Sequence, residues 1–284
     1  MSTLRLSFLI LAMTALFLFV GGLLGGSSGM VMALVFALIF NVGVYWNSDK
    51  LVLKMTRAQA IAPKDAPELY RMTERLADRA GIPMPRLYII PDPQPNAFAT
   101  GRNPEKGVVA VNQGLLNMMN TAEVEGVIAH EIAHIKNRDT LIMALVAAMA
   151  SAIMTLINMA QWAMIFGGMR SDDDDGPGLG GFLLASLLAP IAATIIQMSV
   201  SRSREFEADA TAAQLVGSPQ GLIRALQKLE QGAKAIPSTT ASPQMTHMQI
   251  VNGLSGTRKF SGFARLFMTH PPTSERIAHL NQFA

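Results

Sequence analysis

The hydrophobic residues of this chain are concentrated in four long runs, with most of the polar residues between them. The runs cover about residues 6–24, 30–46, 141–169 and 179–200. A helix needs about 20 apolar residues to cross a bilayer, and each run approaches that length. We therefore predict four transmembrane helices in two hairpins, at residues 1–50 and 139–200. The alternative is that the runs are buried core helices of a soluble protein, an interpretation that is strongest for the third and fourth runs, which contain Gly, Pro and polar residues.

The charges beside these runs predict how the hairpins are oriented. Basic residues flank one end of each run: Arg5, Lys50, Lys54, Arg57, Lys136, Arg138, Arg202 and Arg204. The opposite ends carry "GGSSG" and the acidic "RSDDDDGPG". Because Lys and Arg accumulate on the cytoplasmic side of membrane proteins, residues 51–138 and 201–284 are expected to meet in the cytoplasm as one domain.

The polar block at 51–138 predicts both helices and strands. The segment "DAPELYRMTERLADRAG" has an early Pro, a helical apolar stripe and a final Gly, which predict a helix within residues 65–81. Two β-branched runs, "RLYII" at 86–90 and "GVVAVNQ" at 107–113, predict strands. Between them "PNAFATG", at 95–101, predicts a short edge strand. The sequence thus predicts an α-rich α+β fold with a small β-sheet beside the membrane helices.

Composition narrows the possible chemistry. Half of the residues are hydrophobic and 15% are charged, whereas a soluble domain is about 25% charged. The chain has no cysteine, so a disulfide framework and thiolate metal ligands are excluded. A metal would need His, Asp or Glu. The net charge is only +3 and no basic stripe is interleaved with aromatic residues, which disfavours a nucleic-acid partner.

The helix expected from "NTAEVEGVIAHEIAHIKN" carries the first candidate for chemistry. It begins with Asn120 and Glu123 in capping-box spacing. His130 and His134 are four residues apart, so they project from one face and can bind a single ion. In an H-E-x-x-H pattern the glutamate, here Glu131, acts as general base on a metal-bound water. Zinc suits two imidazoles and an oxygen, and a catalytic site leaves one position open. The alternative is two histidines on an ordinary solvated or packed helix.

A third ligand is expected after the fourth run, in "SRSREFEADATAAQL". Glu205 is the candidate ligand, and Asp209, four residues later, is the candidate acceptor that orients a ligand histidine. Glu207 is a competing ligand whose spacing points it away from Asp209. The hairpin at 139–200 would return the chain to the same membrane face and so bring the two ligand segments together. A charged surface helix is the alternative interpretation.

Four motifs in this order carry a family resemblance. They are "PNAFATG" before the catalytic helix, "HEIAH", "SREFEAD" after a membrane hairpin, and "THPPTSERI" near the C-terminus. Together they resemble the HtpX-type membrane-bound zinc metalloproteases, which are bacterial relatives of the CAAX-prenyl protease group. The resemblance covers nearly the whole chain. It implies four transmembrane helices and a zincin-like catalytic domain on the cytoplasmic side of the bacterial inner membrane.

The resemblance also implies roles for individual residues. One zinc ion per chain would be held by His130, His134 and Glu205, with Glu131 as the base. Asp209 would contact a ligand histidine without binding the zinc itself. In the C-terminal motif, His270 would assist the oxyanion and Arg276 would support the site or contact substrate.

The function that follows is peptide hydrolysis by an integral-membrane zinc metalloendopeptidase. The family implies protein substrates, above all misfolded or damaged membrane proteins, a link to stress, and other membrane quality-control proteases as partners beside the lipid bilayer. We expect substrate to lie as an extra strand along "NAFA", with backbone groups of Asn96 or Ala97 in contact with it. The alternative is that this segment is an ordinary internal strand.

Two rival functions remain. A non-catalytic membrane scaffold with a structural zinc would need a closed site of four protein ligands, and the sequence offers three without a convincing fourth. A secreted soluble peptidase is disfavoured by four apolar runs without a signal-cleavage pattern. Residues 232–268 have no clear period, and a lid or a substrate-entry flap is one interpretation of them. Because a structureless loop of this length is unusual in a compact domain, short helices whose positions the sequence does not give are expected in part of it.

Overall fold

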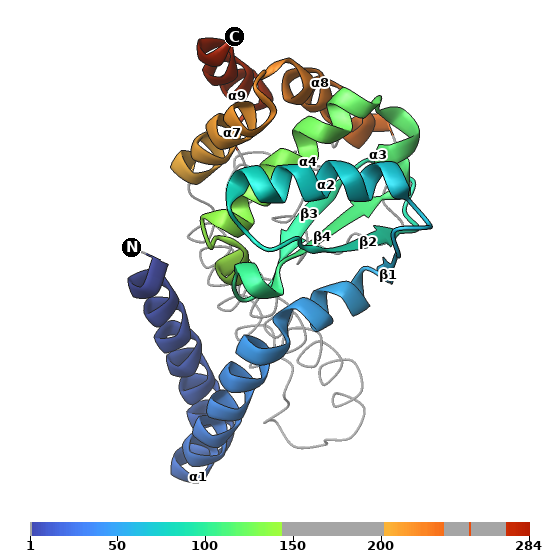
Figure 1. The fold of residues 1–284 in the computed structure, drawn as a ribbon. Helices are drawn as coiled ribbons and strands as arrows, with labels where there is room; N and C mark the ends of the chain where they lie inside the picture. The colour runs from blue at the N-terminus through green and yellow to red at the C-terminus, as the bar shows by residue number, and fades with distance from the viewer. Residues whose placement is uncertain (1, 144–201, 236–249, 251–270) are drawn as a thin grey trace.

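The computed structural model describes residues 2–143, 202–235, 250 and 271–284. This part of the chain is rich in helix and contains one small mixed sheet (Figure 1). It confirms the helical and α+β character expected from the sequence. The predicted runs at 141–169 and 179–200 lie outside the described residues, apart from the first three positions of the third run.

Helix α1, Ser2–Met55, forms an apolar hairpin that leads into the rest of the molecule (Figure 1). The chain reverses at Gly26, whose φ of 56° lies in the left-handed region that glycine adopts without steric cost. Across the hairpin, the ring of Phe17 lies 5.2 Å from that of Phe36, edge to face. The segment Gly26–Asn47 is long and apolar enough to cross a membrane, whereas the apolar segment Ile10–Phe19 is shorter.

Four strands form the sheet in the order β1-β2-β4-β3. Their bounds are Gln59–Ala60 for β1, Arg86–Ile90 for β2, Ala97–Thr100 for β3 and Val108–Asn112 for β4. Strands β2 and β4 are parallel, and the other two pairings are antiparallel. The predicted strands at 86–90 and 107–113 and the predicted edge strand within 95–101 are confirmed. Strand β1 escaped prediction because two residues cannot display a period.

The two faces of the sheet pack against different helices. Alternate strand residues, such as Leu87 and Val109, join a core with α2, Pro67–Ala80, and α4, Thr121–Lys136. The intervening residues, such as Ile90 and Phe98, pack against Val52 and Leu53 near the end of α1. This alternation is the period of two expected for a strand buried on both faces. The end of the hairpin helix is therefore part of the core that supports the sheet.

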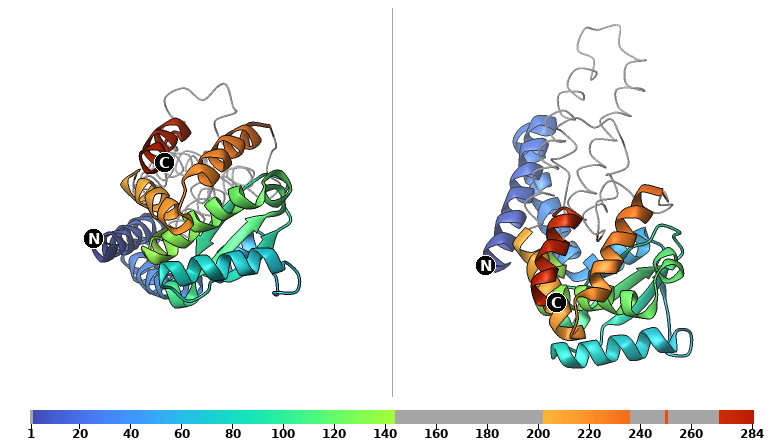
Figure 2. Two further views of the ribbon diagram at one scale, coloured as in Figure 1. Left: turned by 45° about the horizontal axis from the view of Figure 1, so that its top comes forward. Right: turned by 90° about the horizontal axis from the view of Figure 1, so that it is seen from above.

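Helix α4 is the centre of the described domain. It packs against α7, Arg202–Val216, and α8, Gln220–Ala235, which lie beside it in Figure 2 with α9, Thr273–Leu280. The approach of α4 to α8 requires glycine, because a Cβ on Gly126 would lie 2.5 Å from the Leu222 nitrogen. The remaining short elements are η1, Pro104–Lys106, α3, Gln113–Met118, and η5, Asn281–Phe283.

Candidate metal centre

The start of α4 is fixed by the capping box that its sequence predicts. The Asn120 side chain accepts a hydrogen bond from the Glu123 N–H at 3.0 Å, and Glu123 accepts one from the Asn120 N–H at 2.9 Å. Lys228 of α8 donates to the same Glu123 carboxylate at 2.7 Å. Burial alone would raise the pKa of Glu123, but the hydrogen bonds from Lys228 and the Asn120 N–H bring it below its ordinary value. This anchored first turn sets the rotation of the helix that carries both candidate histidines.

Three side chains from α4 and α7 converge in the interior of the domain. The two Nε2 atoms of His130 and His134 lie 3.2 Å apart. The Glu205 carboxylate lies 3.7 Å from His130 Nε2 and 3.5 Å from His134 Nε2. All three side chains are almost fully buried, with 1%, 3% and 1% of their surface exposed for His130, His134 and Glu205.

The separation of these donors fits one small cation. Two ligands at about 2.1 Å from a tetrahedral zinc ion lie about 3.4 Å from each other. The observed spacing of His130, His134 and Glu205, from 3.2 to 3.7 Å, is close to that value. Two neutral imidazoles and a carboxylate are also the donor types that zinc prefers in the absence of thiolates. The three residues can therefore hold a single zinc-sized ion.

The first histidine is oriented by a buried carboxylate. His130 Nδ1 lies 3.0 Å from Asp209 Oδ1, which is the contact expected for Asp209 from its position one turn after Glu205. Burial would raise the pKa of Asp209, but the Arg276 guanidinium lowers it, so this carboxyl is ionised. An ionised acceptor at Nδ1 favours the tautomer that carries its proton there and leaves the Nε2 lone pair free for a cation.

The second histidine has a carboxylate partner that the sequence did not predict. His134 Nδ1 lies 3.2 Å from Asp139 Oδ2. Burial alone would lower the pKa of His134, but the hydrogen bond to Asp139 and the charges of Glu205 and Glu131 raise it to about 9 in the absence of a cation. The environment of this imidazole therefore favours positive charge strongly, as a cation site requires.

The other sequence candidates fall in different places. Glu131 is buried on α4 between the two histidines. Glu207 is exposed whereas Glu205 is buried, so the geometry favours Glu205 over its competitor. Arg276 is buried and lies 3.6 Å from Glu205. His270 lies outside the described residues.

Asn96 and Ala97 are at the start of the edge strand β3. The Asn96 carbonyl accepts a hydrogen bond from the Asn112 N–H of β4 at 2.9 Å. The Asn96 side-chain oxygen accepts a hydrogen bond from the Ile250 N–H at 3.0 Å. Ala97 opens the strand opposite Val111. Strand β3 contacts α4, so the edge of the sheet passes beside the helix that carries the two histidines.

Comparison with known proteins gives the family of this chain. Residues 63–284 match peptidase family M48. A protease HtpX homolog of Desulfatibacillum aliphaticivorans is 54% identical over 273 residues, which cover 96% of this chain and 86% of that protein. A protease HtpX homolog of Pyrococcus furiosus is 48% identical over 280 residues, or 99% of this chain and 95% of that protein.

The fold has a solved counterpart as well. The crystal structure of Ste24p from S. mikatae superposes with a TM-score of 0.53 at 22% identity and covers 94% of this chain. The chain spans 61% of the length of that protein. The family match and the relatives show that the chain is a metalloprotease. The chain belongs to peptidase family M48.

Proposed function

We propose that this chain is an integral-membrane zinc metalloendopeptidase whose metal site is formed by His130, His134 and Glu205. The observation that carries the proposal is the convergence of three buried donor side chains at separations of 3.2 to 3.7 Å. Zinc bound there would polarise the scissile carbonyl and lower the pKa of a water molecule to about 7. One zinc ion per chain follows from this single three-residue cluster in the described part of the chain.

The remaining chemistry belongs to side chains of the protein. The Glu131 carboxylate takes the proton of the attacking water and passes it to the leaving amine nitrogen. Its position one residue after His130, in the same buried turn of α4, supports this role. His270, by resemblance, donates a hydrogen bond to the developing oxyanion, a contribution of about 3 kcal/mol for one donor. Asp209 and Arg276 keep His130 oriented.

Strand β3 provides the binding edge for an extended peptide. Main-chain groups of successive residues in a strand point to opposite sides. The Asn96 carbonyl bonds to Asn112 on β4, so the N–H and C=O groups of Ala97 and Ala99 face away from β4. A substrate added as a further strand would bond to Ala97 and Ala99, while the amide of Asn96 fixes the start of the strand.

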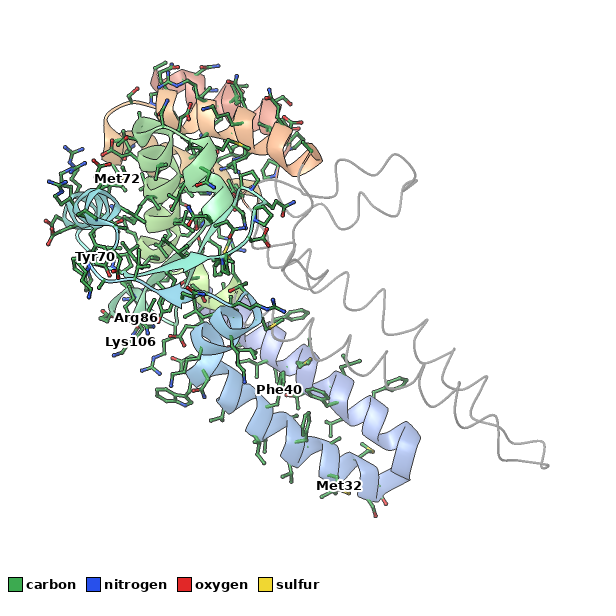
Figure 3. All side chains as sticks on the ribbon, turned by 90° about the vertical axis from the view of Figure 1, so that its right-hand side faces the viewer. Met32, Phe40, Tyr70, Met72, Arg86 and Lys106 are labelled. Carbon is green, nitrogen blue, oxygen red and sulfur yellow. The ribbon has the colours of Figure 1, made fainter. Side chains whose placement is uncertain are left out.

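The hairpin supports a membrane-embedded form of the enzyme. Figure 3 shows its side chains extending along both helices, from Phe40 to Met32 at the far end from the domain. Met32 is 74% exposed, and a series of other large apolar residues of α1 is exposed beside it. An apolar surface of this extent is unfavourable in water and suits the interior of a bilayer.

The resemblance to the HtpX-type metalloproteases implies a membrane-embedded arrangement for the whole chain. Residues 1–50 and 139–200 would be two membrane hairpins, and 51–138 with 201–284 would form the catalytic domain on the cytoplasmic side of a bacterial inner membrane. The substrates would be misfolded or damaged membrane proteins, cleaved under stress alongside other quality-control proteases. The positive charges that follow the candidate span, Lys50 and Lys54, support the cytoplasmic orientation.

The decisive experiment is Glu131→Gln in detergent-purified protein. The variant should retain one zinc by metal analysis and lose casein cleavage by about 10²- to 10⁴-fold, because the base is gone and the ligands are intact. Glu125→Gln, on the surface of the same helix, is the matched control and should cleave normally. Unchanged cleavage by Glu131→Gln would exclude this residue as the base. A parent protein that holds zinc and cleaves no peptide would favour the structural-zinc scaffold.

A further inference from the structure

The chain turns sharply after α4 and returns Asp139 to the side of His134. Helix α4 ends at Lys136, and Arg138 has a φ of 61°, in the left-handed region that residues other than glycine rarely adopt. The Asp139 N–H then donates to the His134 carbonyl at 3.0 Å. This turn brings the Asp139 carboxylate to 3.2 Å from His134 Nδ1 although the two residues are five apart in sequence.

Asp139 has a second partner on the other ligand-bearing helix. Arg204 Nη1 lies 3.3 Å from Asp139 Oδ1, and Arg204 immediately precedes Glu205 on α7. Both residues of this pair are largely shielded from solvent, with side chains 13% and 7% exposed for Arg204 and Asp139. The carboxylate therefore connects the imidazole at the end of α4 with the first turn of α7.

The same arrangement occurs at the other histidine. His130 Nδ1 contacts the Asp209 carboxylate, which also forms an ion pair with Arg276. His134 Nδ1 contacts the Asp139 carboxylate, which Arg204 holds. Each imidazole thus has an acceptor of its own on Nδ1 while both Nε2 atoms turn toward Glu205.

We propose that Asp139 is a positioning residue for the metal site and that Arg204 acts through it. The inference rests on the proposed metal site. Asp139 holds the His134 proton on Nδ1, so that Nε2 presents its lone pair, and it fixes the plane of the ring. Arg204 keeps the carboxylate in place. Carboxylates behind metal-bound histidines raise ligand basicity, and their loss typically weakens metal affinity by about 10- to 100-fold.

The test compares zinc affinities of full-length protein in detergent, measured by competition with a chelator. Asp139→Asn should bind zinc about 10- to 100-fold more weakly than the parent. Arg204→Gln should lose less, because the Asp139–His134 contact survives. The double variant should bind zinc no more weakly than Asp139→Asn, because Arg204 acts on His134 only through Asp139. Asp65→Asn is the matched control: this exposed carboxylate accepts a hydrogen bond from the Ala62 N–H, and zinc affinity should not change.

A second readout separates positioning from a merely structural role. With Co²⁺ in place of zinc, the visible absorption of Asp139→Asn should differ from that of the parent, whereas Arg204→Gln should resemble the parent. If Asp139→Asn folds poorly, the double variant Asp139→Asn/Arg204→Gln is compared with the parent instead, because it leaves no buried charge unpaired. Zinc affinity of Asp139→Asn within twofold of the parent, or equal losses in Asp139→Asn and Arg204→Gln, would overturn the inference. A parent that binds no zinc would instead overturn the proposed function.

Discussion

Arg276 holds Asp209 by two parallel hydrogen bonds in the interior of the domain. Arg276 Nε donates to Oδ2 at 2.8 Å and Nη2 donates to Oδ1 at 2.6 Å, with both side chains no more than 1% exposed. Since Asp209 also contacts His130 Nδ1, the pair ties α9 and α7 to the helix that carries the histidines. Because this guanidinium is so fully enclosed, we expect it to support the site, which is one of the two roles that the family resemblance implies for Arg276.

Replacing Arg276 with leucine should destabilise the metal-free protein strongly. The substitution leaves the Asp209 carboxylate buried without its partner, which costs about 3–5 kcal/mol in comparable pairs. Thermal unfolding of the metal-free protein in detergent would measure the loss. Arg75→Leu is the control, because the Arg75–Glu125 pair lies at the surface and should contribute less than about 1 kcal/mol. Similar shifts in the two variants would contradict the role given to the Arg276–Asp209 pair.

Glu123→Gln should make the protein less stable at neutral pH and less sensitive to acid. The pKa of Glu123 lies below its ordinary value in the folded chain. Such a carboxyl contributes stability above its unfolded pKa, and that contribution is lost as pH falls through the folded value. Glutamine preserves the capping box but loses the ion pair with Lys228, which is partly exposed and so contributes about 1 kcal/mol.

Unfolding temperatures measured from pH 7 down to about pH 2 would test this expectation, because the contribution begins to fall at the unfolded pKa and is gone only below the folded one. The difference between parent and Glu123→Gln should shrink toward the acid end, because the parent carboxyl becomes protonated there. Glu125→Gln, two residues along the same helix, should show only a small and nearly constant difference. A gap between parent and Glu123→Gln that stays constant with pH would show that the Glu123 charge contributes nothing.

Ala99→Pro should weaken peptide cleavage without removing the metal. The Ala99 N–H faces away from β4, so proline there removes a group for substrate and no bond of the sheet. Loss of one backbone hydrogen bond should lower kcat/KM about tenfold. Ala99→Gly keeps the N–H and is the control. Zinc content and unfolding temperature establish that the strand is intact, and full activity in an intact Ala99→Pro protein would exclude this edge as the substrate site.

The parts of the site that sequence predicts are those encoded by local spacing. The four-residue interval of His130 and His134 places both on one face of a helix, and the capping box of Asn120 and Glu123 marks where that helix begins. Both relations are short-range, and the structure contains the helix and its cap. The β-branched runs predicted two of the strands for the same reason.

Other features depend on how distant segments pack. The parallel pairing of β2 with β4 has no signature in either strand alone. Spacing left Glu205 and Glu207 both open as ligands, and their separation into buried and exposed follows from the rotation of α7 against α4. Asp139 could not be predicted, because its contact needs Arg138 in a left-handed conformation that arginine seldom adopts.

Trp46 should report the depth of the hairpin in a bilayer. It stands at the end of the candidate span Gly26–Asn47, is 54% exposed, and has the Arg102 guanidinium 4.4 Å from its ring centre. Tryptophan prefers the interface between hydrocarbon and headgroups, and a cation over its ring suits that depth. The chain has only two tryptophans, so Trp162→Phe leaves Trp46 as a single fluorophore. In liposomes, lipids brominated near the headgroup should quench it more than lipids brominated near the chain end. Trp46→Phe in the same background controls for residual signal, and stronger quenching from the chain end, or none at all, would contradict an interfacial position for this end of the hairpin.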